Sequence, residues 1–382
     1  MINEDNRVAD APDGTINTIH YLKPGNDNYD GDYEPWLYDR AMTLYGIYIR
    51  SGNLDVLRQA HRNTFYYASH LDDEGYFNMK WSGGKPARDL KYSYAESLLT
   101  DILLTGDEKR IQDIEKMPIA ASRFKYTYHP QEIDFWTERH FAFAWLIYIV
   151  AYEATGNAVY AEEARKRAET VFHHQQHPPV HPEHGQAPAT GALMHSFAAH
   201  EGWWDASHPY WVFSPWMTAL LVDAMQRYYL HSADERVLES AQRFGNAIMD
   251  SGMAVRDGWP DFGGYLIEGS PVPHYLAGIE RGYYEWADYE HCLDVAKTTA
   301  FAYHCSILSH TPNSKYLQAT DALLESARVV MDYWIRPSGP DYGKSIYRLA
   351  PPRKGNWWFR TTQDIDYLTQ FENVGVERWI DY

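Results

Sequence analysis

A cluster of ionisable residues stands at the start of one of the most apolar segments of the chain. Glu138, Arg139 and His140 lead directly into residues 141–152, nearly all of which are apolar or aromatic. A helix that is apolar on every face is predicted to be buried. Charged groups in its first turn are therefore unexpected unless they bind a ligand or pair with one another. Cations there also lie at the unfavourable end of the helix dipole, which attracts anions. We predict that Arg139 and His140 receive an anionic group; the alternative is that they only pair with Glu138 and Asp134.

Histidines are concentrated in the segment that follows the next amphipathic helix. Eight of the 18 histidines of the chain lie there: His173, His174, His177, His181, His184, His195, His200 and His208. His195 and His200 lie among apolar residues on a predicted short helix, so they are candidates for a general base, since imidazole titrates near neutral pH. The alternative is a hydrogen-bonded core histidine. His177, His181 and His184 have metal-ligand residue types, but no cysteine supports them, and we predict a polar loop with no metal.

Further cations and aromatic residues are predicted at the same kind of position, at or near the entrances of buried helices. Together with the cluster above, they would form a focused site for carboxylates on an otherwise acidic protein. Aromatic pairs beside loop glycines and prolines are typical of a glycan groove, although about half of them are expected in the core. The predicted substrate-binding residues are Arg88, Lys91, Tyr92, His200, Trp203, Trp204, Tyr210 and Arg281.

The architecture that positions these residues is indicated by a recurring turn. The segments around Gly52, Gly106 and Gly156 each end one helix and begin another through Asn or Asp, with looser copies near Ala233 and Asn313. The helices before the turns are apolar on most faces, whereas those after the turns carry one apolar stripe, as in residues 158–172. The helices predicted before the turns are Trp36–Ile49, Leu90–Leu104, Phe141–Tyr152, Trp216–Tyr229 and Cys292–Leu308.

Alternating buried and striped helices predict an all-α fold, an (α/α) toroid of about five to seven antiparallel helical hairpins in a single domain of residues 1–382. Five hairpins are clear, and a sixth is expected in residues 185–213, 251–290 or the C-terminal tail. Long loops at 175–213 and 251–290 would lie on the active face. The only strands expected are a small hairpin of residues 263–271 and 343–352. Parallel buried helices would turn their N-terminal ends, and hence the predicted site, toward one face.

Composition and missing motifs exclude several functions. The net charge of −18, with 52 acidic and 34 basic residues, is unsuited to nucleic acid, and no segment predicts a transmembrane span. Two cysteines in an apolar segment, Cys292 and Cys305, predict free buried thiols. The chain has no P-loop, Rossmann glycine pattern, HExxH or GxSxG motif, and we expect no cofactor. The first residues lack a signal-peptide core; a periplasmic or secreted location stays open if a signal was removed.

The aromatic toroid with its His/Arg/Tyr cluster resembles polysaccharide lyases that act on uronic-acid polymers, including alginate and glucuronan lyases of polysaccharide lyase family 38. The resemblance rests on the architecture and on "WTERH" followed by "LMHS". It implies β-elimination on an acidic polysaccharide, in which Arg139 and His140 neutralise the uronate carboxylate, His195 removes the C5 proton and a tyrosine protonates the leaving oxygen. The candidates for that tyrosine are Tyr210, Tyr265, Tyr283 and Tyr284, with Tyr265 and Tyr284 preferred over the others.

Two other functions remain open. An inverting glycoside hydrolase, or another sugar-processing enzyme such as an epimerase, would use the same toroid; a hydrolase needs paired carboxylates. The carboxylates predicted near the active face are Asp39, Glu96, Glu138, Asp205 and Glu280. A non-catalytic glycan-binding scaffold is the third reading. The ultraviolet absorbance of the conjugated product distinguishes a lyase from a hydrolase.

Overall fold

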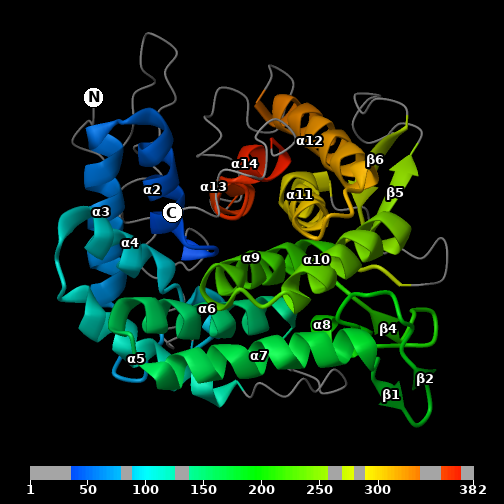
Figure 1. Ribbon diagram of the computed structural model, residues 1–382, viewed down its shortest axis with the longest axis horizontal. Coiled ribbons are helices and arrows are strands. Elements are labelled where there is room, and N and C mark those ends of the chain that lie inside the picture. The colour runs from blue at the N-terminus through cyan, green and yellow to red at the C-terminus, as the bar shows by residue number, and fades with distance from the viewer. Residues whose placement is uncertain are drawn as a thin grey trace. The chain divides into compact units, whose positions relative to one another are not determined.

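A computed structural model of the protein describes residues 36–78, 88–124, 137–256, 269–278, 289–335 and 354–370. These residues are predominantly helical (Figure 1). The helices are α2 Arg40–Ser51, α3 Leu54–Ser69, η2 Leu90–Tyr92, α4 Glu96–Thr105, α5 Arg110–Arg123, α6 Glu138–Thr155, α7 Ala158–Gln176, α8 Phe197–Glu201, α9 Pro215–Ser232, α10 Arg236–Ala247, η3 Ile248–Gly252, η5 Tyr289–His291, α11 Cys292–Leu308, α12 Ser314–Ile335, α13 Lys354–Phe359 and α14 Ile365–Thr369. No helix among the described residues has the length and apolarity that crossing a membrane requires.

The recurring turns join the helices as the sequence predicts. Gly52 ends α2 with a φ of 66°, a left-handed conformation that glycine adopts without a steric penalty. The side chain of Asn53 then accepts hydrogen bonds from the backbone of Asp55 and Val56 and begins α3. Ala233 ends α9 with a φ of 49°, so this turn keeps the geometry without glycine. The polar turn residues therefore stop one helix and cap the next.

Five helical hairpins are confirmed. Helix α2 packs on α3, α4 on α5 and α9 on α10. The rings of Tyr148 in α6 and Tyr160 in α7 have centroids 6.3 Å apart. The hydroxyls of Thr299 in α11 and Thr320 in α12 lie 2.8 Å apart. Residues 185–213 contain no sixth hairpin of long helices, and much of the other two predicted locations lies outside the described residues.

Burial separates the two kinds of helix. Helix α11 is buried on nearly every face from Cys292 to Ser306. Helix α10 buries one stripe that includes Val237, Ala241 and Phe244, while Glu239 on another face is exposed. The first helix of a hairpin therefore contributes core on all sides, and the second covers it with one face.

The strands are short and form three antiparallel pairs. β1 Val180–His181 pairs with β2 Gly185–Gln186, β3 His195–Ser196 with β4 Trp211–Val212, and β5 Met253–Arg256 with β6 Ser270–Pro273. The sequence predicted that residues 263–271 pair with residues 343–352, but β6, which begins at Ser270, pairs with β5. Residues 343–352 lie outside the described residues. His195 lies on β3 rather than on the predicted short helix, and only His200 lies on helix α8. Both residues of β3 are buried, and a strand of two residues is too short to show a periodicity that the sequence could reveal.

Contacts along the chain group the residues into two compact units. Unit 1 contains residues 1–125, 143–164 and 331–360, and unit 2 contains residues 126–142, 165–330 and 361–382. In unit 1, α4 packs on α2, α3 and α5, and α13 packs on α2. In unit 2, α11 packs on α9, α10 and α14. The predicted single domain stays a prediction.

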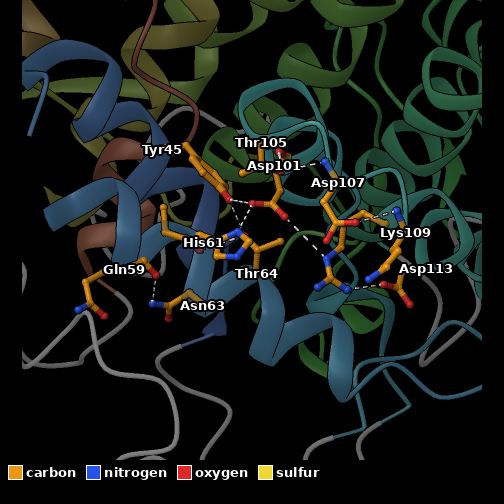
Figure 2. A network of polar contacts seen from close by, with 12 residues as sticks. Tyr45, Gln59, His61, Asn63, Thr64, Asp101, Thr105, Asp107, Lys109 and Asp113 are labelled. Atoms are coloured by element: carbon orange, nitrogen blue, oxygen red, sulfur yellow. Dashed lines mark hydrogen bonds and ion pairs between the residues drawn. The ribbon is translucent and has the colours of Figure 1, made fainter. Parts of the chain in front are cut away.

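A buried carboxylate joins the helices of unit 1 (Figure 2). Asp101 of α4 has no exposed surface. Its Oδ1 accepts a hydrogen bond of 2.6 Å from the Tyr45 hydroxyl of α2 and lies 2.7 Å from Nδ1 of His61 in α3. Its Oδ2 lies 3.7 Å from Nε of Arg110 in α5, which also contacts Asp113. The network therefore connects four consecutive helices through one side chain.

Candidate functional site

The predicted cluster at the start of α6 forms a buried polar site in unit 2. Glu138 and His195 have no exposed surface. Glu138 Oε1 accepts a hydrogen bond of 3.1 Å from the backbone N–H of Ser214, the N-cap of α9. Glu138 Oε2 lies 3.3 Å from Nε2 of His195 on β3. The carboxylate thus connects the start of α6 to the start of α9 and to the β3–β4 ladder.

The two ring nitrogens of His195 both face protein groups. Nδ1 donates to the backbone carbonyl of Ser196 over 3.0 Å, which leaves Nε2 directed at Glu138. Burial by itself lowers the pKa of His195, but the charge of Glu138 and the hydrogen bonds overcome it, so the pKa is raised. His195 therefore forms a fully buried ion pair with Glu138. Both ring nitrogens of His195 face protein groups in this structure, and its general-base role stays a prediction.

His200 is chemically different from His195, although their rings stack with centroids 5.7 Å apart. Burial lowers the pKa of His200 well below its usual value, and the positive charges of His195, Arg139 and His140 lower it further. Its Nε2 shares a hydrogen bond of 3.2 Å with the Tyr275 hydroxyl. A neutral imidazole paired with a phenol is suited to proton transfer.

The first turns of three buried helices meet at this site. The guanidinium of Arg139 in α6 lies 5.5 Å from the ring centroid of Trp216 in α9. Trp216 stacks on His291, the N-cap of α11, with centroids 4.7 Å apart. His291 Nδ1 forms a short contact with the carboxylate of Asp294. For α6, α9 and α11, the predicted convergence of helix starts is confirmed.

The helix starts of unit 1 also carry charge. Asp39 caps α2 through the backbone N–H of Met42, in a left-handed conformation with a φ of 47°. Glu96, the first residue of α4, forms an ion pair with Arg360. Burial raises the pKa of Asp39, although the charge of Arg360 opposes the increase. Both carboxylates proposed for a hydrolase in this unit are therefore buried beside one guanidinium.

The remaining predicted cations of unit 1 already have carboxylate partners. Arg88 lies 2.9 Å from Glu74 and 3.6 Å from Asp72. Lys91 lies 3.0 Å from Asp89, and its ammonium is 5.4 Å from the ring centroid of the buried Tyr92. These cations are neutralised by their own neighbourhood, which weakens the predicted role in substrate binding. Arg281, Tyr265, Tyr283, Tyr284 and Glu280 lie outside the described residues.

The predicted aromatic residues form a cluster in the segment between α7 and α9. Tyr210 stacks on His184 with centroids 3.8 Å apart, and Trp204 meets His184 edge-on at 4.7 Å. Trp203 is 45% exposed and packs edge-on against Phe197. The β3–β4 ladder connects this cluster to His195. Asp205 in the same loop is held by Ser207 and His208, which lower its pKa to about 2.

Metal binding has no support in the part of the chain that the structure describes. It contains no group of three or more His, Cys, Asp or Glu side chains that could hold an ion. His181 and His184 instead pack on one another and on Tyr210. Cys292 and Cys305 are both free and buried, as the sequence predicts.

Four residues of the candidate site were missed or undervalued by the sequence analysis. Tyr275 follows β6, and its role depends on contact with His200, 75 positions away in the chain. His291 and Asp294 stand at the start of α11, and the position alone could have identified them. Glu138 was weighed as a possible hydrolase carboxylate and as a local partner of Arg139 and His140, but not as the partner of His195.

Comparisons with known proteins establish the fold. No protein-family model and no curated relative matches the chain. A sugar epimerase from a ruminal bacterium matches with 14% identity over 87% of both chains and a TM-score of 0.53. The unsaturated glucuronyl hydrolase from Bacillus sp. GL1 matches with 12% identity over 92% of this chain and 89% of that chain, with a TM-score of 0.54. An unsaturated glucuronyl hydrolase specific for heparin matches with 12% identity over 96% of this chain and 91% of that chain, with a TM-score of 0.52.

This likeness shows that the chain has the all-α (α/α) toroid fold of helical hairpins that the sequence predicts. The similar structures are described as hydrolases and an epimerase of sugars, whereas the resemblance noted from the sequence was to lyases.

Proposed function

We propose that the protein is a glycoside hydrolase that acts on an oligosaccharide containing a uronic acid. The fold is shared with enzymes that hydrolyse unsaturated glucuronyl groups, and the start of α6 carries cations suited to a uronate carboxylate. This choice follows the hydrolase alternative of the sequence analysis, which the solved structures favour over β-elimination.

The observation that carries the proposal is the placement of Arg139 and His140 where three helices begin. Arg139 and His140 are half-buried, whereas Glu138 and His195 behind them have no exposed surface. Backbone N–H groups and dipoles at the starts of α6, α9 and α11 favour a negative ligand. The carboxylate of a uronate would complement both the cations and the dipoles, and Trp216 would flank the sugar ring.

Glu138 and His195 are assigned a positioning role in this proposal. Their ion pair and the bond from Ser214 fix the first turn of α6, which sets the position of Arg139 and His140. The backbone N–H of Ser214 and the ring of His195 together fix the position of this carboxylate. The pair therefore supports the anion site without contacting the ligand.

Ultraviolet absorbance of an unsaturated uronide tests the proposal. Hydrolysis releases an unsaturated uronic acid that rearranges to a keto acid, so the absorbance of the conjugated double bond falls. Saturated uronides and neutral glycosides serve as the comparison substrates. Arg139→Gln is expected to reduce kcat/KM on uronides at least about tenfold, equivalent to about 1.4 kcal/mol, with a smaller effect on neutral glycosides. No turnover of any uronide would reject the proposal.

A second candidate function, β-elimination, is favoured by one observation. The neutral His200 and the Tyr275 hydroxyl form the imidazole–phenol pair that abstraction of a C5 proton and protonation of the leaving oxygen require. In this reading His200 replaces His195 as the base. A lyase creates the conjugated double bond, so absorbance rises on a saturated polymer, and the direction of the change separates the two candidates.

A further inference from the structure

Aromatic rings gather at the surface of the segment between α7 and α9, next to the proposed anion site. Trp203 is 45% exposed and is the one exposed tryptophan among the side chains that the structure describes. Tyr210 is half-buried and stacks on His184, which also meets Trp204 edge-on. His181 packs on both His184 and Tyr210. We call these side chains, His181, His184, Trp203, Trp204 and Tyr210, the aromatic platform.

Local hydrogen bonds hold the aromatic platform in place. Nδ1 of His181 accepts hydrogen bonds of 3.1 and 3.3 Å from two backbone N–H groups of the turn that follows it. Trp204 Nε1 donates to the backbone carbonyl of His208 over 3.0 Å. The ring of His208 in turn packs edge-on against Trp203, with centroids 4.8 Å apart. Rings that are already fixed lose little conformational freedom when a ligand stacks on them, which favours binding.

The aromatic platform adjoins the anion site through shared packing. Trp204 of the platform and Tyr275 of the site pack against one cluster of buried residues, which consists of Phe197, Val212 and Leu276. Trp203 lies edge-on to Phe197 with centroids 5.2 Å apart, and the backbone N–H of Phe197 donates to the carbonyl of Tyr210 over 2.8 Å. A sugar chain that extends from a uronate at the start of α6 past Tyr275 would therefore meet the platform next.

The fixed charge beside the platform is opposite in sign to that of the anion site. Residues 177–214 contain no lysine or arginine. The side chain of Asp205 is 59% exposed, and hydrogen bonds within its own loop lower its pKa to about 2, so it is ionised. Burial raises the pKa of Tyr210, and the charge of the exposed Glu183 adds to the increase, which places that carboxylate near the phenol. These carboxylates repel a second uronate but not a neutral sugar.

We propose that the aromatic platform binds neutral sugar units linked to the uronate, so that the substrate is a heteropolymer rather than a chain of uronates; this rests on the proposed function. The C–H groups on the face of a pyranose ring are apolar and slightly positive, and they stack on the negative face of an aromatic ring. Cations at the start of α6 select the acidic sugar, and rings beside carboxylates select the neutral sugars that follow it.

Substrates of increasing length test the platform. The methyl glycoside of an unsaturated uronate is compared with the same uronate linked to one, two or three glucose units, and with all-uronate chains of equal length. Glucose is a suitable probe because its equatorial hydroxyls leave C–H groups free on both ring faces. At about pH 8, where free imidazole is neutral, wild-type kcat/KM should rise at least about tenfold with the added glucose units. It should be at least about tenfold lower on the all-uronate chains.

Variants of the exposed rings identify the source of this gain. Trp203→Ala should remove most of the gain through KM, and should change kcat/KM on the methyl uronide by less than about twofold. Trp203→Phe keeps a ring and should retain part of the gain. Phe65→Ala is the matched control, because Phe65 in unit 1 is 58% exposed, and it should change neither substrate series. Glu183→Lys supplies a cation and should raise kcat/KM on the all-uronate chains at least about threefold.

The outcomes separate the platform from the proposed function. If the wild type hydrolyses the methyl uronide but gains nothing from glucose units, or if Trp203→Ala keeps the gain, the platform is overturned while hydrolysis stands. If the wild type hydrolyses no uronide, the proposed function fails, and calorimetric titration with a tetrasaccharide of β-linked glucose decides the platform. Binding by the wild type that Trp203→Ala loses supports the platform, and absence of binding by the wild type overturns it.

Discussion

Each of the two units contains a buried carboxylate that faces a histidine, but the surroundings of the two pairs differ. In unit 1, the buried Asp101 faces His61 over 2.7 Å, and in unit 2 the buried Glu138 faces His195 over 3.3 Å. Asp101 lies within α4 and also contacts Tyr45 and Arg110, whereas Glu138 is the first residue of its helix.

The difference lies in what surrounds the two carboxylates. The His61 side chain is 42% exposed, and the groups around Asp101 connect helices along their lengths. His195 has no exposed surface, and its neighbours are the starts of α6, α9 and α11 beside half-buried cations. The two pairs therefore differ in position: helix starts surround Glu138, whereas Asp101 connects helices along their lengths, and the proposed function rests on this difference.

The largest expected effect distinguishes Glu138 from Asp101. Substitution of Glu138 should reduce activity, and substitution of Asp101 should reduce stability. Glu138→Gln should reduce turnover at least about 100-fold, because the ion pair that positions Arg139 and His140 is lost. Asp101→Asn should leave kcat/KM within about threefold but lower the free energy of unfolding by about 2 kcal/mol, a value reduced for the partly solvated partners. Steady-state kinetics and urea unfolding of both variants measure this. Equal activity losses would remove the distinction.

The pH dependence of stability should distinguish the two stacked histidines of unit 2. The raised pKa of His195 gives stability that is fully present below the unfolded value of about 6.5 and is lost as pH rises through the folded pKa. The lowered pKa of His200 has the opposite sign, so stability falls as pH drops below about 6.5. His200→Gln should therefore reduce the acid-induced loss of melting temperature, and His195→Gln should increase it. Thermal unfolding from about pH 5 to pH 8 measures both, and parallel curves for the two variants would contradict the assignment.

Two arginines test whether a predicted cation serves a ligand or the fold. Arg139→Gln should reduce kcat/KM for uronides at least about tenfold, as stated for the proposed function. Arg88→Gln should change kcat/KM on the same substrate by less than about twofold, since Glu74 and Asp72 already neutralise this exposed arginine. A comparable fall in kcat/KM for both variants would contradict this distinction and indicate that Arg88 also contacts the substrate.

The smallest expected effect concerns the imidazole of unit 1. His61→Ala should lower the free energy of unfolding by less than about 1 kcal/mol, because the half-exposed ring exchanges its contact with Asp101 for water. Activity should not change. Chemical denaturation of this variant is compared with that of His195→Ala, which leaves Glu138 buried without its cation. His195→Ala should lower the free energy of unfolding by about 3 kcal/mol or more.

Local patterns predicted much of the helical scaffold. The start and end of α11 coincide with the predicted Cys292–Leu308, because its apolar run is continuous and its ends carry polar residues. Helix α4 begins later than the predicted Leu90, since Leu90–Tyr92 forms a separate 3₁₀ turn whose backbone Tyr67 and Tyr94 help to hold. The bond from Tyr67 comes from 25 positions away in the chain and therefore leaves no trace in a local pattern.

The site was predicted only in part for the same reason. Arg139 and His140 were identifiable because cations at the start of an apolar helix conflict with the helix dipole. Tyr275 was not, because its role depends on contact with His200, which lies 75 positions away in the chain.

The sequence by itself determined the periodicity of the helices, the recurring capped turns and the acidic charge, since each depends on residues close together in the chain. The tertiary structure decided that His195 is buried against Glu138 and that the ring of His200 contacts the hydroxyl of Tyr275. Those pairings depend on side chains brought together from distant positions, where burial and neighbouring charge, rather than residue type, set the protonation of each group.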